Sequence, residues 1–261
     1  MIYITGANGW LGLNLINCIV NGITEKWGLE NNQLNALIEP GGDIGMITKI
    51  SPGINIIEGD MRNIDDLNKF LCKSKDSILF HTAGVIHPKF VKEFYSVNKD
   101  GLKNLLQSSS DHSIKRVVIM SSNSPCGCND INGGPFDESS KYNPYMNYGT
   151  SKMEMEKYAN SFYEESSLDL TIIRAPWFYG PHQPPRQKLF FEMIRNGKMP
   201  IVGGGENLRS MVFTENLVQG LVLAGTKEVA KGKTYWIADK VPYSMNKIVS
   251  TIKSVFSQEF N

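Results

Sequence analysis

The chain has few cysteines, no long apolar run and almost no net charge. Four cysteines in 261 residues do not make a disulfide framework, so a reducing cytoplasm is the expected location. No apolar run approaches the roughly 18 residues that a membrane span needs, and the first residues lack a secretory pattern. A net charge of +1, without blocks of like charge, offers no basic field to nucleic acid. We therefore expect neither a membrane nor a nucleic-acid partner.

Metal binding is not expected either. Cys126 and Cys128 flank Gly127, but no second cysteine pair or histidine cluster completes the four ligands of a zinc site. What the chain does have is a regular alternation of short apolar segments with amphipathic ones. This order predicts an α/β fold, a doubly wound, Rossmann-like parallel sheet. The expected strands are 1–4, 34–39, 54–58, 77–80, 116–120, 170–173 and 235–237, and the expected helices are 10–20, 64–71, 90–106, 145–165, 189–194, 214–224 and 243–256.

The alternation weakens after Arg174, where proline- and glycine-rich breaks interrupt the chain. We expect residues 1–174 to form a dinucleotide-binding core and residues 175–261 a small C-terminal substrate-binding lobe. The lobe would be interleaved with the core as one structural unit. It would lie over the carboxyl ends of the strands, where ligands of open α/β sheets bind.

Three glycines follow the first strand and precede the first helix. Gly6, Gly9 and Gly12 are spaced G-x-x-G-x-x-G, one residue wider in the first half than the common dinucleotide fingerprint. Glycines allow the backbone and the helix N-terminus to approach a pyrophosphate closely. The same turn contributes Asn8, Trp10 and Leu11 to the predicted cofactor site. For Trp10, a place in the core or an interface is the alternative.

Acidic residues follow the second and third strands. Glu39 stands where the adenine ribose would lie, and its carboxylate could accept ribose hydroxyls while repelling a 2′-phosphate. It favours NAD, with NADP as the alternative cofactor. An exposed loop acid is the other interpretation of Glu39. Asp60, with Met61 beside it, could face the adenine amino group, or Asp60 could be a turn or helix-capping residue.

Tyr148 and Lys152 stand four residues apart in a predicted helix, so they share a face. A nearby ammonium favours the phenolate and would lower the pKa of Tyr148 from about 10 towards the working pH. The tyrosine could then serve as a general acid or base. Such a pair also arises by chance on amphipathic helices. Here the preceding strand ends in Ser121-Ser122-Asn123-Ser124, and a serine hydroxyl there could donate to the same substrate oxygen.

As a set these motifs identify a family. The chain resembles the extended short-chain dehydrogenase/reductases, specifically the NAD-dependent epimerase/dehydratase group, over nearly its whole length. The resemblance rests on Thr5-Gly6 to Gly12, Gly59-Asp60, His81 to Gly84, Val97-Asn98 with Gly101 and Asn104 to Leu106, Val117 to Ser122 with Gly127, Tyr148 with Lys152, Arg174 to Pro181, and Arg209 to Leu217.

The resemblance implies a catalytic set of Ser122, Tyr148 and Lys152, with Ser124 as the alternative serine. Asn98 would support the active-site helix, or only brace it. The resemblance also implies further contacts with the two ligands. For the cofactor these are Ala83, Gly84, Ser121, Tyr148, Lys152, Pro176 and Phe178, and for the substrate Val85, Ser122, Asn123, Ser124, Trp177 and Arg209. Close packing is the alternative role of Ala83 and Gly84.

Departures from the family pattern narrow the substrate. Asn123-Ser124 stand in place of the Asp-Glu pair of the family's dehydratases. A 4,6-dehydratase activity is therefore not expected. Trp177 and Asn216 replace an asparagine and an aspartate that are common in sugar-nucleotide members. Steroid-dehydrogenase-like members often have asparagine at the position of Asn216, and residues 81–88 resemble that branch. Arg209 fits the position that grips a pyrophosphate, although a surface salt bridge is its alternative.

The resemblance therefore implies an NAD(P)-dependent enzyme with three open assignments. The first is an epimerase or related oxidoreductase of a nucleotide sugar, in which hydride leaves the sugar and returns. The second is a dehydrogenase or ketoreductase of a sterol-like or other secondary alcohol. The third is a non-catalytic dinucleotide-binding sensor. Family members commonly form homodimers through the helix at 145–165, and we expect the same of this chain.

Overall fold

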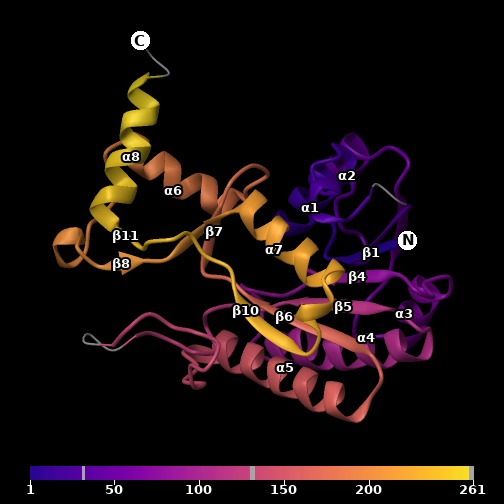
Figure 1. Ribbon diagram of the computed structural model, residues 1–261. Helices are drawn as coiled ribbons and strands as arrows, with labels where there is room; N and C mark the ends of the chain where they lie inside the picture. The colour runs from indigo at the N-terminus through magenta and orange to yellow at the C-terminus, as the bar shows by residue number, and fades with distance from the viewer. Residues whose placement is uncertain (31–32, 130–132, 259–261) are drawn as a thin grey trace.

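Seven parallel strands form the central sheet of the computed structural model, which describes residues 1–30, 33–129 and 133–258 (Figure 1). This arrangement confirms the predicted α/β, Rossmann-like fold. Along the sheet the order is β10 (Lys233–Trp236), β6 (Asp169–Arg174), β5 (Arg116–Met120), β4 (Ile78–His81), β1 (Ile2–Thr5), β2 (Leu34–Ile38) and β3 (Asn55–Glu58).

Helices cover both faces of the sheet, which is why β1, β2 and β5 are buried along their whole length. On one face α1 (Trp10–Val20) and α7 (Thr214–Thr226) pack together, with α2 (Gly45–Ile50) beside α1. On the other face lie α3 (Ile64–Leu71), α4 (Gly101–Asp111) and α5 (Met146–Glu165) (Figure 1). No helix in the described residues is long and apolar enough to span a bilayer.

The strand order reverses between β1 and β4, which are neighbours in the sheet although two strands separate them in the sequence. In doubly wound sheets this reversal opens a crevice beyond the carboxyl ends of the strands, and ligands bind there. The Thr82 hydroxyl donates to the carbonyl of Thr5 at 2.8 Å, so the loop after β4 is tied to the turn after β1. The fold thus places the glycine turn at the reversal.

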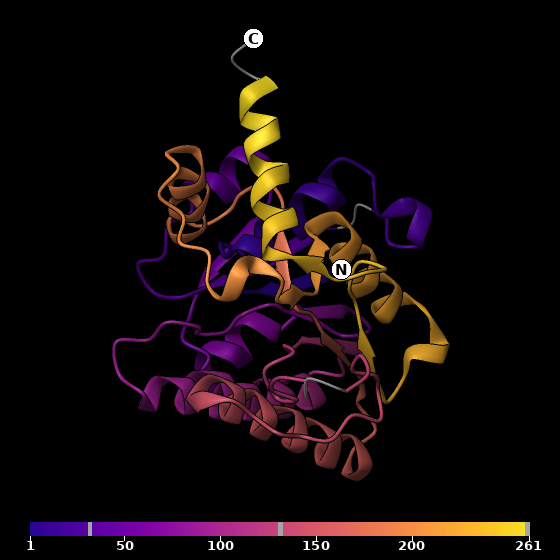
Figure 2. The same ribbon diagram turned by 90° about the vertical axis from the view of Figure 1, so that its left-hand side faces the viewer.

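The C-terminal third contributes to both the sheet and a lobe. β10 pairs with β6, and α7 packs on α1, so these segments return to the core. In the lobe, β7 (Trp177–Tyr179) pairs with β9 (Met211–Phe213), and β8 (Leu208–Arg209) pairs with β11 (Tyr243–Ser244). There α6 (Pro185–Arg195) packs against α8 (Met245–Gln258), which points away from the sheet in both views (Figures 1 and 2). The division at residue 174 stays a prediction.

Several predicted elements differ from the structure. The helix predicted over 189–194 begins four residues earlier, as α6, and the strand predicted over 235–237 is β10, at 233–236. The segment predicted as one helix over 90–106 is a π-helix, η2 (Phe94–Asp100), followed by α4. The terminal helix begins two residues later than predicted, because 243–244 pair as β11, and the Ser244 hydroxyl caps α8 by accepting the Lys247 N–H at 3.1 Å. The sequence did not predict α2, β7, β8, β9, β11 or the 3-10 turns η1 (Glu25–Trp27), η3 (Gly203–Gly205) and η4 (Glu228–Ala230).

Candidate active site

The turn between β1 and α1 leaves no room for side chains at two of its three glycines. Gly6 has a φ of +66°, and a Cβ there would lie 2.6 Å from the Cα of Ala83. A Cβ at Gly12 would lie 2.8 Å from the Cα of Ala7 and would collide with the Gly6 carbonyl oxygen. Gly9 caps α1 without a side-chain hydrogen bond, which leaves the first N–H groups of the helix to other partners. This cradle fits the pyrophosphate of a dinucleotide.

Two large residues of the same turn make packing contacts. The Trp10 indole N–H donates to the Pro181 carbonyl at 2.7 Å, and its ring centroid lies 4.6 Å from that of Phe178. Leu11 is buried in the core beneath the turn. Trp10 therefore joins the start of α1 to the lobe, as in the alternative that the sequence left open for it.

At the carboxyl end of β2, Glu39 and Asn8 lie close together. A Cβ at Gly42 would lie 2.8 Å from the Asn8 amide nitrogen and 3.4 Å from the Glu39 Cγ. Glu39 is exposed, so its carboxylate is accessible to a ribose. After β3, the Asp60 carboxylate accepts hydrogen bonds from the side chain of Arg62, which lower the pKa of Asp60. That pairing matches the turn-residue alternative for Asp60, and Met61 beside it is buried.

Ser122 and Tyr148 meet beyond the carboxyl end of β5. Tyr148 lies in the first turn of α5, close enough to Ser122 that the serine hydroxyl lowers the pKa of the phenol. The Ser122 hydroxyl also lies 3.2 Å from the Ser124 hydroxyl and 3.3 Å from the Asn123 amide oxygen. Of the two candidate serines, Ser122 is the one whose hydroxyl acts on the pKa of the phenol. The tyrosine is partly accessible to solvent, as a group that touches a substrate must be.

The pKa of Tyr148 moves in the direction opposite to the one predicted. Burial raises it to about 12, and the hydrogen bond with Ser122 only partly opposes the rise. The Lys152 ammonium, which was expected to stabilise the phenolate, donates instead to the Met120 carbonyl at 3.1 Å. Burial of the phenol therefore sets the direction of its pKa shift, although Lys152 lies four residues away on the same helix face.

Lys152 is itself buried, with 4% of its surface exposed. A Cβ at Gly84 would lie 3.3 Å from its Nζ, so the ammonium sits between β5 and the loop after β4. Burial lowers the pKa of Lys152 to about 8, and the Glu156 carboxylate one helical turn away opposes the fall. The charge of Lys152 is therefore present at neutral pH and is lost in mildly alkaline solution.

Asn98, on the π-helix, connects that loop to α5. Its side chain accepts the Val85 N–H at 2.8 Å and donates to the Val85 carbonyl at 3.1 Å. It also donates to the Ser151 hydroxyl at 3.2 Å, beside Lys152. π-turns are frequent at functional sites. Here the π-helix places the Asn98 side-chain amide between the loop at Val85 and the helix α5. These three bonds brace the active-site helix against the loop that carries Val85.

On the lobe side, Trp177 lies among polar and aromatic partners. Its indole N–H donates to the Gln187 amide oxygen at 3.2 Å, and its ring packs edge-on against Phe190. The Arg209 guanidinium lies 5.8 Å from the Trp177 ring centroid. Arg209 is exposed and forms no ion pair with another described residue, so the salt-bridge alternative for it is not what the structure shows.

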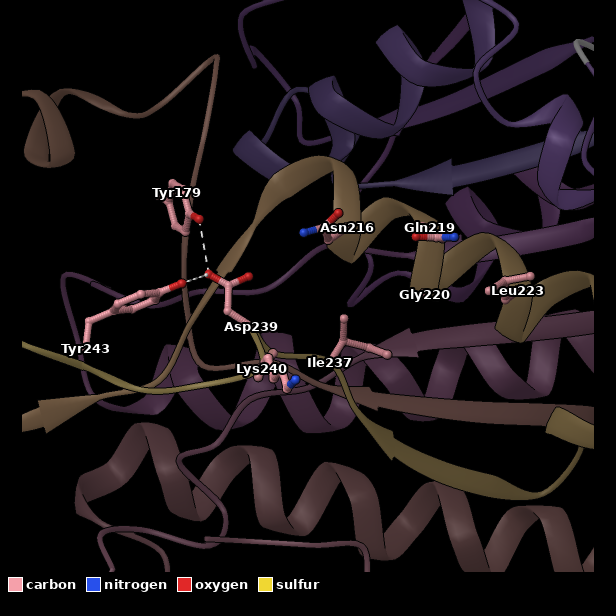
Figure 3. Close-up of a pocket in the computed structure, with 10 residues that line it drawn as sticks. Tyr179, Asn216, Gln219, Gly220, Leu223, Ile237, Asp239, Lys240 and Tyr243 are labelled. Atoms are coloured by element: carbon pink, nitrogen blue, oxygen red, sulfur yellow. Dashed lines mark hydrogen bonds between the residues drawn. The ribbon is translucent and has the colours of Figure 1, made fainter. Parts of the chain in front are cut away.

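A separate pocket of about 660 Å³ opens between α7 and the segment after β10 (Figure 3). Asp239 accepts hydrogen bonds there from the Tyr179 and Tyr243 hydroxyls at 3.1 and 3.2 Å. Asn216 lies on its helical wall. None of the predicted catalytic residues lines this pocket, so we give it no part in the chemistry.

His81, at the end of β4, gives the fold a pH dependence. It is fully buried, its Nδ1 lies 2.8 Å from the Thr5 hydroxyl, and burial with the nearby Lys152 charge lowers its pKa to about 3. Between about pH 6.5 and 3 the unfolded chain binds a proton on this histidine and the folded chain does not. Its contribution to stability is therefore complete above pH 6.5 and is lost progressively as the pH falls towards 3, by up to about 5 kcal/mol.

We expect the urea midpoint of unfolding to fall between pH 7 and pH 5 by a smaller amount in His81→Gln than in the wild-type protein. The same substitution at His112, at the outer end of α4, serves as the control and should leave the wild-type pH dependence intact. An equal pH dependence in wild type and His81→Gln would contradict this account of His81.

Residues 2–238 match the model of the NAD dependent epimerase/dehydratase family. The chain belongs to that family. It is thus an enzyme, an oxidoreductase of the NAD-dependent epimerase/dehydratase type, and NAD is the cofactor that its family supports. The glycine turn and the Ser122, Tyr148 and Lys152 positions lie within the matched residues.

The chain has relatives that are named for different substrates. It is 40% identical to uncharacterized protein y4nL of Sinorhizobium fredii, over the whole chain and 73% of that protein. It is 25% identical to the N-acetyl-alpha-D-glucosaminyl-diphospho-ditrans,octacis-undecaprenol 4-epimerase of Escherichia coli O157:H7, over 99% of the chain and 73% of the relative. It is 26% identical to a 3-beta-hydroxysteroid dehydrogenase of Mycolicibacterium neoaurum, over 94% and 67%.

Among solved structures, the family fold recurs in DesIV, a dTDP-glucose 4,6-dehydratase of Streptomyces venezuelae. The TM-score is 0.86 at 23% identity, and the match covers 98% of this chain and 81% of DesIV. At this identity the likeness concerns the fold.

Two buried polar residues beside the site were not singled out from the sequence. Glu156 is fully buried one turn after Lys152, and Gln187 is nearly buried against Trp177. The spacing of Glu156 from Lys152 was visible in the sequence, since residues four apart share a helix face. Its burial and its partners depend on β5 and β6, which no local pattern reveals. For Gln187 no sequence signal pointed to the contact with Trp177.

Proposed function

We propose that this enzyme is a nucleotide-sugar 4-epimerase that uses NAD and has Tyr148 as its acid and base. The observation that supports the chemistry best is that the Ser122 hydroxyl acts on the phenol of Tyr148, on the helix face that also carries the buried Lys152. A hydroxyl pair at the mouth of the crevice can hold one substrate oxygen and move its proton.

In this proposal Tyr148 takes the proton of the sugar C4 hydroxyl, and Ser122 donates a hydrogen bond to the same oxygen. A bound NAD would supply a reversible hydride acceptor at C4. Tyr148 would return the proton to the same oxygen when the C4–H bond re-forms on the other face of the sugar. Because its pKa in the structure is about 12, Tyr148 needs a nearby positive charge to work as a base, and Lys152 can supply it.

Support for a sugar diphosphate comes from Arg209 and from the relatives. An exposed guanidinium without an ion-pair partner can bind a diphosphate through its planar set of donors. The E. coli relative and DesIV are both named for sugars carried on a diphosphate. DesIV is a dehydratase, but Asn123 and Ser124 offer no acidic pair for loss of water, so epimerisation is the better proposal here.

The M. neoaurum relative favours a second candidate, oxidation of a sterol-like secondary alcohol by the same residues. The exposed carboxylate of Glu39 makes NAD the proposed cofactor over NADP. A homodimer through α5 stays a prediction.

The test is incubation of the purified protein with UDP- and dTDP-sugars, without added NAD, followed by NMR of the sugar protons. We expect the C4 epimer to accumulate. Arg209→Ala should raise KM by about 10- to 100-fold and change kcat much less, because the lost contact is to the diphosphate and not to C4. Lys240→Ala, an exposed cation of the pocket in Figure 3, is the matched control. NADH formation from a sterol alcohol, with every sugar inert, would establish the second candidate instead.

A further inference from the structure

Glu156 is a fully buried carboxylate that holds three segments of the site together. Its oxygens accept hydrogen bonds from Arg174 Nη2 at 2.6 Å and from Arg174 Nε at 3.1 and 3.2 Å. The Tyr142 hydroxyl donates to it at 2.9 Å, and the Ser121 hydroxyl donates to its other oxygen. The partners come from β6, from the loop before α5 and from the end of β5.

The ion pair of Glu156 and Arg174 is closed off from water. Arg174 is 4% exposed, and its guanidinium lies 5.3 Å from the Tyr142 ring centroid and 5.5 Å from that of Trp236. Burying two charges is costly, and apolar residues of similar size often stabilise a fold as well or better. Stability alone therefore does not account for this pair.

The position of the pair relates it to the reacting groups. Ser121 directly precedes Ser122, so a bond to its hydroxyl orients the end of β5 that presents the Ser122 side chain. Glu156 is one helical turn beyond Lys152 and two beyond Tyr148, on the same face of α5. Arg174 ends β6 immediately before the segment that leads into β7.

We propose that Glu156 is a positioning residue, which aligns Ser122 with Tyr148 through its bonds to Ser121 and Arg174 and sets its carboxylate one helical turn from the Lys152 ammonium. The alignment matters for catalysis only if the proposed acid–base function of Tyr148 is correct. The electrostatic effect on Lys152 does not depend on the substrate.

Few titratable or charged groups among the described residues face Lys152. Tyr148 and Glu156 lie on its own helix, and His81 faces it from β4. Arg174 on β6 pairs with Glu156 and is not among the groups that shift the pKa of Lys152. His81 is uncharged at neutral pH because burial holds its pKa near 3. Glu156 is therefore the group that raises the pKa of Lys152 against the effect of burial. Without its charge, Lys152 should lose its proton at a lower pH.

The experiment compares Glu156→Gln with Glu154→Gln. Glu154 lies two residues earlier on α5 and pairs with Lys99 at 2.7 Å at the partly exposed helix surface. The protein is labelled with ¹³Cε-lysine, Lys152→Arg assigns the Lys152 signal, and its chemical shift is followed from pH 6 to pH 10. We expect the midpoint to fall by about one unit or more in Glu156→Gln. In Glu154→Gln it should move by less than about 0.3 unit, because exposed charges are screened.

A wild-type midpoint in Glu156→Gln, or an equal fall in Glu154→Gln, would overturn the inference. If Glu156→Gln does not fold, the double variant Glu156→Met with Arg174→Met replaces the ion pair by an apolar pair and should also show a lower midpoint. If a sugar is turned over, the alkaline fall of kcat should occur about one pH unit lower in Glu156→Gln than in the wild-type protein, at unchanged KM. A lower midpoint with every sugar inert refutes the proposed function and leaves this inference standing.

Discussion

Tyr148→Phe should lower turnover by about a thousandfold while NAD binds as tightly as to the wild-type protein, within about threefold. The substitution removes only the hydroxyl, the group on which Ser122 acts. The ring that packs 6.0 Å from Phe94 stays in place, so the start of α5 should keep its structure. Removing a general acid or base typically costs a factor of about 10² to 10⁴.

The matched control for this prediction is Tyr145→Phe. Tyr145 immediately precedes α5 and is 64% exposed, so losing its hydroxyl should change neither turnover nor binding. Turnover is measured with the sugar or alcohol that the wild-type protein converts, and NAD binding by quenching of tryptophan fluorescence. Full activity in Tyr148→Phe would show that the phenol is not the acid or base. If the wild-type protein binds NAD but converts no sugar or alcohol, the assignment as a non-catalytic sensor is favoured.

The sequence predicted best those elements whose pattern is local. β5 and α1 have the bounds expected of them, since one is almost wholly apolar after Arg116 and the other is a complete amphipathic stretch bounded by Gly9. The short strands of the lobe were not predictable, because β7 and β9 each have three residues and exist through pairing across more than 30 positions. The π-helix was also outside local prediction, since the helical pattern continues through it.

The same distinction applies to the candidate site. The glycine turn and the spacing of Tyr148 and Lys152 are sequence features, and the fold brings their segments together. The direction of the Tyr148 pKa was predicted wrongly, because spacing reveals a possible partner but not how deeply the phenol is enclosed. The ion pair of Glu156 with Arg174 joins residues 18 positions apart, and it can be recognised only once α5 is seen to pack against β6.

Gly12→Ala should destabilise the protein by about 2–3 kcal/mol and weaken NAD binding at least about a hundredfold. Inside an ordinary helix, alanine in place of glycine would stabilise by about 1 kcal/mol. Here the added Cβ would lie 2.8 Å from the Cα and the carbonyl oxygen of Ala7 and would overlap the Gly6 carbonyl. These are backbone atoms that cannot rotate away, so overpacking reverses the sign of the substitution. The displaced turn would also move the cradle that fits the pyrophosphate.

Gly53→Ala provides the control, because a Cβ at Gly53 would meet nothing within 4 Å. Its urea midpoint and its NAD titration should match those of the wild-type protein. The two readouts for Gly12→Ala separate the two roles of the residue. A lower midpoint with unchanged NAD binding would mean that Gly12 serves only the packing of α1 on β1. Stability and binding both equal to wild type would mean that the turn can relax without cost, and that the cradle is not what holds the dinucleotide.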